Sequence, residues 1–161
     1  MRIKIIYASK HGTTEKVAGL IAEKLMAIHK VELISLKKNA NPDLSDCEIV
    51  VLGTSIYAGK ASGKMKAFCK ANESALLLKR MGLFVCGMEP DQAKREQELK
   101  DAYSEELLKG AAVTGFLGGE LLFEQMNFFE RLIISKIAKT KKTVHQIDLE
   151  TINVFVEKLW S

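Results

Sequence analysis

The sequence is poor in the residues that mark disordered or disulfide-linked chains. Only two of its 161 residues are proline, and 27% are charged against 47% hydrophobic. This composition argues against disorder and predicts one compact domain, residues 1–161, with a sizeable core. The three cysteines, Cys47, Cys69 and Cys86, are far apart and form no C-x-x-C pair. We therefore expect reduced, buried thiols in a cytoplasmic protein.

The sequence also lacks the patterns of a membrane span, a signal peptide and a metal site. No apolar run approaches the roughly 20 residues that cross a bilayer, and the first apolar segment, residues 3–8, is too short for a signal peptide. His11, His29 and His145 do not stand at ligand spacing from the cysteines, so no metal is predicted. The net charge of +4, from 24 basic and 20 acidic residues, gives little basis for a nucleic-acid partner.

Short apolar segments alternate with longer segments of helical periodicity. This alternation is typical of a parallel sheet with helices on both faces. The expected strands are residues 3–8, 31–36, 48–53 and 82–87, with a fifth inside 112–122. The expected helices are residues 17–28, 64–71, 91–108 and 149–160, with an extra helix at 125–139 that five alternating units do not require. The second strand is the most polar, which predicts a place at the edge of the sheet.

A small, polar loop follows the first expected strand and consists of Ser9, Lys10, His11, Gly12, Thr13 and Thr14. Backbone N–H groups at the start of a helix lack intrahelical partners, and the helix dipole favours an anion there. The hydroxyl groups add donors, and Gly12 lets the backbone approach a phosphate closely. The loop has neither Walker A nor G-x-G-x-x-G spacing. Taken alone, it fits a phosphate site and an ordinary helix cap at Thr13 or Thr14 equally well.

Two further loops are expected at the same edge of the sheet. One follows the third strand and contains Thr54, Ser55, Ile56, Tyr57, Ala58 and Gly59; the other follows the fourth strand and contains Gly87 and Met88. The carboxyl ends of neighbouring parallel strands meet at one edge, so a ligand cleft is expected there. Tyr57 is a candidate for stacking on a ligand ring, or else a surface aromatic. Cys86 is interpreted as a core thiol and not as a nucleophile.

Residues 9–15 resemble the [ST]-x-T-G-x-T loop of flavodoxins, with His11 in place of the middle threonine. The resemblance covers nearly the whole chain. It implies a flavodoxin-like, doubly wound, five-stranded parallel sheet of order 2-1-3-4-5, with flavin mononucleotide (FMN) as cofactor. It also implies that residues 9–14 bind the phosphate and residues 54–59 lie along the isoalloxazine ring. Gly87 and Met88 are assigned to the other edge of the flavin by position only, and His11 either donates to the phosphate or faces solvent.

One branch of that family is the most similar, the bacterial flavodoxin-like protoporphyrinogen oxidases. They share a Gly-x-Ser-Ile segment, here residues 53–56, and a basic, aromatic helical insertion that residues 118–136 resemble. This similarity implies a dehydrogenase that passes electrons to a quinone, and it assigns no catalytic residue. The alternative is an electron-transfer module without its own substrate, although a sequence isoelectric point near 8.9 is unlike the acidic electron-carrier flavodoxins. A domain without flavin and an NAD(P)H-dependent reductase are further alternatives, and no dinucleotide fingerprint supports the second.

Residues 125–142 predict a peripheral membrane contact. Four apolar residues of this span share one helical stripe, and basic residues crowd its polar side and tail: Met126, Phe129, Ile133 and Ile137, then Arg131, Lys136, Lys139, Lys141 and Lys142. A helix of this kind can lie on the anionic inner face of a membrane, where a quinone is available. In the other interpretation the stripe packs on the sheet and the lysines are solvated.

Overall fold

The computed structural model describes residues 1–121, 127, 130–132 and 144–161. Its main sheet has the order β2-β1-β3-β5-β6, all parallel, with the short strand β4 added antiparallel to β3. The strands of this path are β1 (Arg2–Ala8), β2 (Lys30–Ser35), β3 (Ile49–Tyr57), β5 (Arg80–Cys86) and β6 (Val113–Phe116). This arrangement confirms the predicted flavodoxin-like order 2-1-3-4-5 and the edge position of the second strand.

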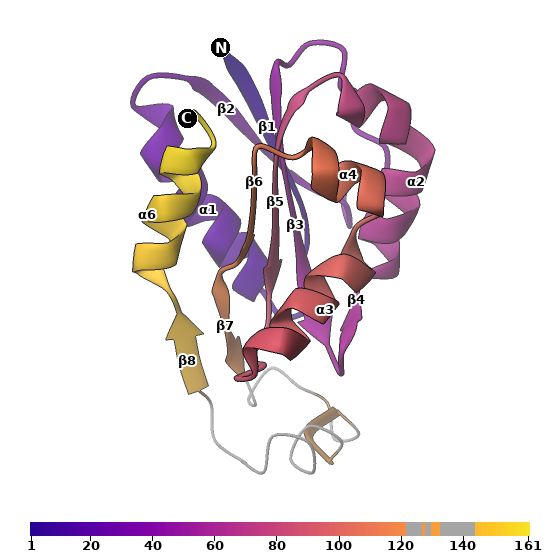
Figure 1. Cartoon of the computed structure of the whole chain (residues 1–161), viewed down its shortest axis with the longest axis vertical. Helices are drawn as coiled ribbons and strands as arrows, with labels where there is room; N and C mark the ends of the chain where they lie inside the picture. Colours follow the sequence, from indigo (N-terminus) through magenta and orange to yellow (C-terminus); the bar gives the residue numbers. More distant parts are fainter. Residues whose placement is uncertain (122–126, 128–129, 133–143) are drawn as a thin grey trace.

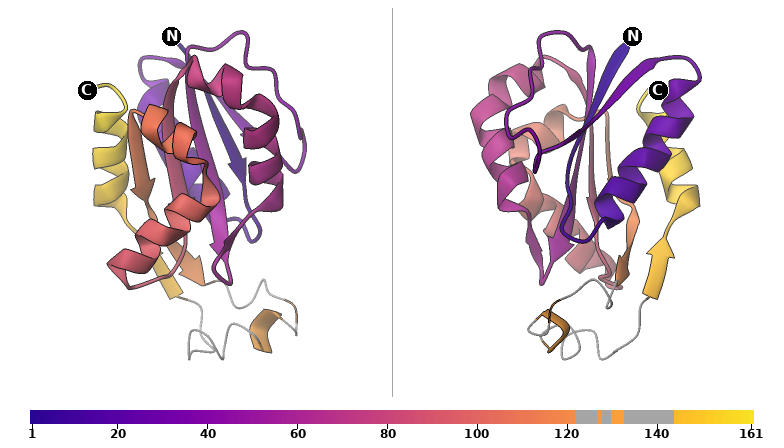
Figure 2. Two further views of the ribbon diagram at one scale, coloured as in Figure 1. Left: turned by 45° about the vertical axis from the view of Figure 1, so that its right-hand side comes forward. Right: turned by 180° about the vertical axis from the view of Figure 1, so that it is seen from behind.

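Helices cover both faces of the sheet (Figure 1). Both chain termini lie at the end of the sheet opposite the carboxyl ends of its parallel strands. One face carries α1 (Thr13–Met26) and α6 (Leu149–Lys158). The other carries α2 (Gly63–Leu77), α3 (Gln92–Ala102) and α4 (Glu105–Gly110), as the turned views of Figure 2 show. Each helical layer buries the sheet face beneath it.

Alternating side chains of β1 divide the core into two clusters. Ile5 joins Val17 and Ile21 of α1 in one cluster, whereas Ile6 joins Met65 of α2 in the other. All five side chains are fully buried. Each Å² of apolar surface that is buried stabilises the fold by about 25 cal/mol. This core therefore holds the ends of the strands and the starts of the helices in fixed positions.

The prediction of one continuous helix over residues 91–108 is wrong. The chain is extended at Tyr103, between α3 and α4, with φ −128° and ψ 148°. The buried Tyr103 hydroxyl lies 2.7 Å from the carbonyl oxygen of Phe84 and 3.0 Å from that of Leu52. Ser104 then starts α4, because its hydroxyl accepts a hydrogen bond from the N–H of Leu107 at 3.3 Å. A tertiary contact of the tyrosine therefore overrides the local helical pattern.

Two strand predictions also need correction. The third strand continues beyond Gly53 through Tyr57 and turns back into β4 (Lys60–Ala61) through Ala58 and Gly59, which have φ 50° and 77°. The two positive φ values are those of a tight hairpin turn. The segment 112–122 is not one strand, because Gly118 at φ 80° separates β6 from β7 (Gly118–Leu121). Strand β7 pairs antiparallel with β8 (Val144–Ile147), a pairing that the sequence did not predict.

The extra helix expected at residues 125–139 lies mostly outside the described residues. Of this span the structure describes residues 127 and 130–132, and 130–132 are helical. The helix therefore stays a prediction. Within the described part of the chain, no helix has the length and apolar character needed to cross a membrane.

We predict that Gly53→Ala destabilises the fold by about 1–3 kcal/mol, the usual cost of overpacking a core. A Cβ atom at this position would lie 2.0 Å from Cζ of the buried Phe84 ring. Gly19→Ala is the matched control, because a Cβ at that helical position meets no atom within 4 Å. It should gain about 0.5–1 kcal/mol. Urea unfolding of both variants checks the pair, and equal stability of Gly53→Ala and the wild type would contradict the packing argument.

Candidate functional site

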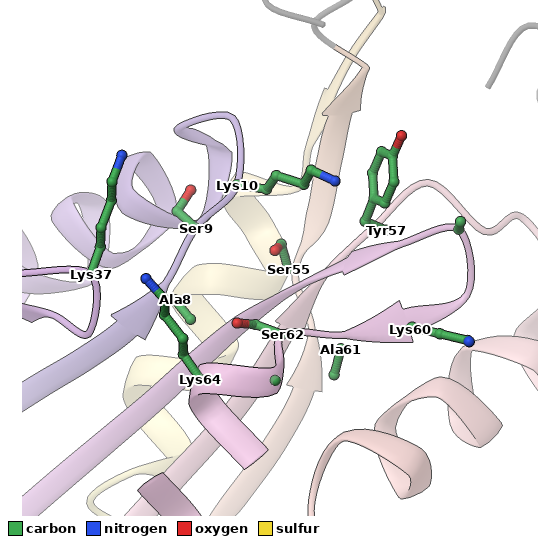
Figure 3. A pocket seen from close by; sticks show the side chains of 12 residues that line it. Ala8, Ser9, Lys10, Lys37, Ser55, Tyr57, Lys60, Ala61, Ser62 and Lys64 are labelled. Atoms are coloured by element: carbon green, nitrogen blue, oxygen red, sulfur yellow. The ribbon is translucent and has the colours of Figure 1, made fainter. Parts of the chain in front are cut away.

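A cavity of about 880 Å³ opens at the carboxyl ends of β1 and β3 (Figure 3). It is bounded by the end of β1, the loop into α1, the chain after β2, the β3–β4 hairpin and the start of α2. Its lining residues are Ala8, Ser9, Lys10, Lys37, Ser55, Tyr57, Ala58, Lys60, Ala61, Ser62, Gly63 and Lys64. The volume lies within the usual range of ligand sites, about 300–1,000 Å³.

Helix α1 begins without a side-chain cap. Its N-cap residue is Gly12, at φ 93° and ψ −9°, which has no side chain that could cap the helix. By contrast, Asp91, Ser104 and Asp148 cap α3, α4 and α6. Neither Thr13 nor Thr14 can be the cap, because both lie inside the helix. The helix-cap interpretation of the loop is therefore wrong, and the first-turn N–H groups keep their capacity to bind an anion.

Two hydroxyl groups of the loop are bound to protein partners. Ser9 accepts a hydrogen bond from the N–H of Gly12 at 3.0 Å, and Thr13 donates to Glu120 at 3.3 Å. Thr14 is fully buried, and its hydroxyl forms no hydrogen bond with any residue that the structure describes. Any anion at this loop would thus be held by backbone N–H groups and Lys10 more than by threonine hydroxyls.

Cys86 itself behaves as a core residue. Burial raises the pKa of its thiol to about 12, so the thiol is neutral at physiological pH. Cys47 and Cys69 are likewise free and buried. The expectation of three reduced, buried thiols is confirmed, and nothing in the surroundings of Cys86 activates it as a nucleophile.

The segment of residues 54–59 contributes to the cavity through Ser55, Tyr57 and Ala58. Thr54 has a different position: it is fully buried, and its hydroxyl accepts a hydrogen bond from the N–H of Ser62 at 3.2 Å. This bond ties the start of α2 to β3. Tyr57 lies beneath the Lys10 ammonium, which is 3.6 Å from the centre of the tyrosine ring. The two loops predicted to form a cleft therefore meet directly.

The third predicted loop lies apart from the cavity lining. Gly87 donates its N–H to the carbonyl oxygen of Gly118 at 2.9 Å, and a Cβ added to it would touch Phe116 and Ile56. Gly87 and Met88 thus lie at the carboxyl end of β5 against β7, and they are half-buried. Their assignment to a flavin edge stays a prediction.

Glu130 contacts three of the predicted site residues. Its carboxylate lies 2.8 Å from Nε2 of His11 and 3.6 Å from Nζ of Lys10. Burial raises the pKa of Glu130, but the charges of His11 and Lys10 and the hydrogen bond with His11 lower it more, so the net pKa lies below its ordinary value. Burial and this carboxylate both raise the pKa of Tyr57. His11 therefore faces Glu130, and not open solvent.

A second carboxylate, Glu120 of β7, lies beside the first turn of α1. Its side chain is only 2% exposed and is bound by Nζ of Lys16 at 3.0 Å, by the hydroxyl of Thr13 and by Nδ1 of His145. Glu120 and His145 are direct neighbours across the β7–β8 ladder. Burial raises the pKa of Glu120, but hydrogen bonds from His145 and Lys16 outweigh burial and hold the pKa below its ordinary value of 4.5.

Sequence reasoning missed several residues around the cavity and the two carboxylates. The missed residues are Ala8, Lys37, Lys60, Ala61, Ser62, Gly63 and Lys64 in the lining, and Lys16, Glu120, Glu130 and His145 beside it. A signal existed for Lys37, which follows the strand next to β1 in the predicted order. Glu120 and Glu130 reach the loop before α1 and its first turn through contacts that span more than 100 residues. His145 reaches Glu120 through the unexpected strand β8. No local sequence pattern indicates any of the three.

We predict that Glu120→Gln lowers the free energy of unfolding by about 1–2 kcal/mol near pH 6, the value of charge-assisted hydrogen bonds. Because the folded pKa of Glu120 is depressed, its contribution is present above pH 4.5 and is lost as the pH falls through the folded value. The difference between variant and wild type should thus shrink toward pH 3. Glu105→Gln is the control, since its pair with Lys109 is 74% exposed on both sides and should contribute little. Urea unfolding at several pH values checks both, and a pH-independent difference would refute the assignment.

Known proteins similar to this chain are consistent with the geometry. A family profile described as "Flavodoxin domain" matches residues 4–148. A curated relative from Leishmania major, named "Protoporphyrinogen IX dehydrogenase [quinone]", is 25% identical over 141 residues, which cover 84% of this chain and 61% of that protein. A flavodoxin from Clostridium saccharobutylicum is 31% identical over 84 residues, which cover 51% of this chain and 52% of that protein. The chain therefore spans about three fifths and about half of the length of these relatives.

Solved structures show the same fold. A short-chain flavodoxin associated with a non-canonical PDU bacterial microcompartment has a TM-score of 0.62 and 19% identity, and the match covers 99% of this chain and 97% of that one. The family profile extends over most of the chain, from β1 to the residue before α6. The chain belongs to the flavodoxin family, and this membership supports FMN as its cofactor.

Proposed function

We propose that the chain is an FMN-dependent dehydrogenase that takes electrons from a porphyrinogen and passes them to a quinone. The Leishmania major relative, which aligns with 84% of this chain, bears a name that describes this reaction. The observation that carries the cofactor part of the proposal is the uncapped start of α1 next to the cavity.

The residues fit the parts of FMN as follows. The first-turn N–H groups of α1, together with Lys10, would hold the phosphate, since Gly12 presents no side chain to obstruct it. Ser55 and the hairpin turn would lie along the ring system, and Tyr57 offers an aromatic surface there. Gly87 and Met88 would approach the flavin from the end of β5. Bound FMN supplies the redox chemistry, and the chain supplies binding and orientation.

Residues 125–142 belong to the same proposal as the contact with the inner face of a membrane. Quinones are lipid-soluble, so an acceptor of this kind is reached at a membrane surface. The described part of the segment places Glu130 on the β1–α1 loop. This contact supports a position of Glu130 beside the proposed flavin site.

A flavodoxin-type electron carrier is the second candidate function. The Clostridium saccharobutylicum relative and the microcompartment-associated structure are both named flavodoxins. A carrier would dock to a protein partner and would turn over no substrate of its own. The net charge of +4 argues against docking to the basic partners that acidic carriers use.

The deciding experiment is anaerobic reduction of the FMN-loaded protein with protoporphyrinogen IX, followed by addition of a soluble quinone. We expect bleaching of the flavin absorbance by the porphyrinogen, recovery with the quinone, and formation of porphyrin. Dithionite titration in the same cell gives the total flavin that can be reduced. Flavin that binds and accepts electrons from dithionite but never from the porphyrinogen would overturn the dehydrogenase proposal and favour the carrier.

We predict that two variants change FMN affinity in opposite directions. Lys10→Met removes a cation from the phosphate loop and should weaken FMN about tenfold, the value of one charge-assisted hydrogen bond. Glu130→Gln removes the carboxylate that pairs with Lys10 and His11, so it should tighten FMN several-fold. Riboflavin, which has no phosphate, should show neither change.

Flavin fluorescence titrations measure all of these affinities. Lys24→Met is the control variant for charge, because Lys24 is exposed in the last turn of α1, at the far end of the helix from the loop. If Lys10→Met weakened FMN and riboflavin equally, the phosphate would not be bound at this loop.

A further inference from the structure

The cavity lining has an unusual charge composition. Four lysines border the cavity, Lys10, Lys37, Lys60 and Lys64, and among the lining residues that the structure describes there is no aspartate or glutamate. Lys10 pairs with Glu130, whereas the other three form no ion pair with any residue that the structure describes. The three come from separate parts of the chain: the segment after β2, strand β4 and the first turn of α2. The fold thus gathers uncompensated positive charge around one space.

Two of these lysines share one wall. In Figure 3 the side chains of Lys37 and Lys64 extend toward the side of the cavity where Ala8 and Ser9 lie, whereas Lys60 points away. The hydroxyl groups of three serines border the same space, Ser9, Ser55 and Ser62. An anion on this side of the cavity would be attracted by both ammonium groups.

The start of α2 adds to this wall. Ser62 is the N-cap residue, but its side chain makes no capping hydrogen bond, and the first turn holds no acidic residue. The first N–H groups of this 15-residue helix therefore face the wall, and no acidic residue of its own first turn neutralises them. This end is distinct from the start of α1, where Glu120 and Glu130 already supply negative charge.

We propose that Lys37 and Lys64, with the start of α2, form an anion subsite that binds a carboxylate group of the redox substrate. The inference rests on the proposed function and deepens it. FMN has a single phosphate, which the loop before α1 accounts for, so the second cationic wall is left for another anion. Porphyrinogens of the proposed substrate class carry propionate carboxylates, whereas a quinone carries no charge. The subsite would hold the substrate by its acidic edge and turn its remaining surface toward the flavin.

The test uses the full-length, FMN-loaded protein and the double variant Lys37→Met/Lys64→Met. The probes are protoporphyrin IX, which has two carboxylates, and its dimethyl ester, which has none; porphyrin absorbance and fluorescence report binding. The wild type should bind the diacid at least tenfold more tightly than the ester, and the variant should lose that preference. In the dehydrogenase assay the variant should raise KM about tenfold at unchanged kcat. FMN affinity should stay within about twofold of the wild-type value.

The control is Lys66→Met/Lys70→Met, which removes the same charge from α2 at exposed positions outside the cavity lining. It should bind diacid and ester as the wild type does. A variant at Lys37 and Lys64 that keeps the diacid preference would overturn the subsite. Loss of FMN affinity in that variant would also overturn it, because the lysines would then belong to the phosphate site. A lysine-dependent diacid preference without any turnover would uphold the subsite and reject the dehydrogenase.

Discussion

The backbone at Gly12 turns from β1 into α1 in a left-handed conformation and gives that helix an N-cap residue without a side chain. A glycine N-cap costs about a few tenths of a kcal/mol relative to serine, threonine, asparagine or aspartate. The chain tolerates this cost because the burial of apolar side chains stabilises α1 by much more. Val17, Ile21 and Leu25 pack α1 on the sheet, and each is at most 1% exposed. The free N–H groups are therefore held in a fixed direction before any ligand arrives. Preorganised donors of this kind bind an anion without a cost of rearrangement.

The distribution of charge around the cavity follows from which parts of the chain meet there. On the α1 side, Glu120 and Glu130 come from the C-terminal part of the sequence and pair with Lys16, Lys10 and His11. On the α2 side the neighbouring segments that the structure describes bring lysines and serines to the cavity lining but no carboxylate. The two positions that we propose as anion sites at this edge of the sheet therefore differ in character. The first is partly neutralised by the protein, and the second is not.

The sequence predicted those features that depend on local pattern. The strand order, the helical layers, the buried cysteines and the approach of Ser9 and Lys10 to Ser55 and Tyr57 follow from alternation of apolar segments and from the geometry of parallel sheets. The break at Tyr103 did not follow, since it depends on carbonyl groups in β3 and β5 that the tyrosine hydroxyl reaches. Ser-Glu-Glu at residues 104–106 is typical of a helix start. The helical periodicity of residues 91–108 continues across it, however, and this continuity favours one helix.

The site was less predictable than the fold for the same physical reason. Residue type and position suggested that Thr13 and Thr14 offer hydroxyl groups to a phosphate, but the Thr13 hydroxyl is bound by Glu120, which lies far away in sequence, and Thr14 is fully buried. The sequence around Lys64 predicts a helix and nothing more. Its place in the proposed anion subsite follows only from the fold, which brings Lys37 to the same wall of the cavity.

The β7–β8 ladder connects this site to the segment that distinguishes the chain from a minimal five-stranded fold. Leu121 and Val144 are paired across the ladder, so both ends of the intervening residues are held together at the edge of the molecule that carries the site. Glu120 binds Lys16 and Thr13 at the start of α1, and His145, its partner in the ladder, also binds the Glu120 carboxylate. Glu130 makes a second connection through His11. A change in either carboxylate therefore acts on the helix end that we propose for the phosphate, because both carboxylates contact residues there directly.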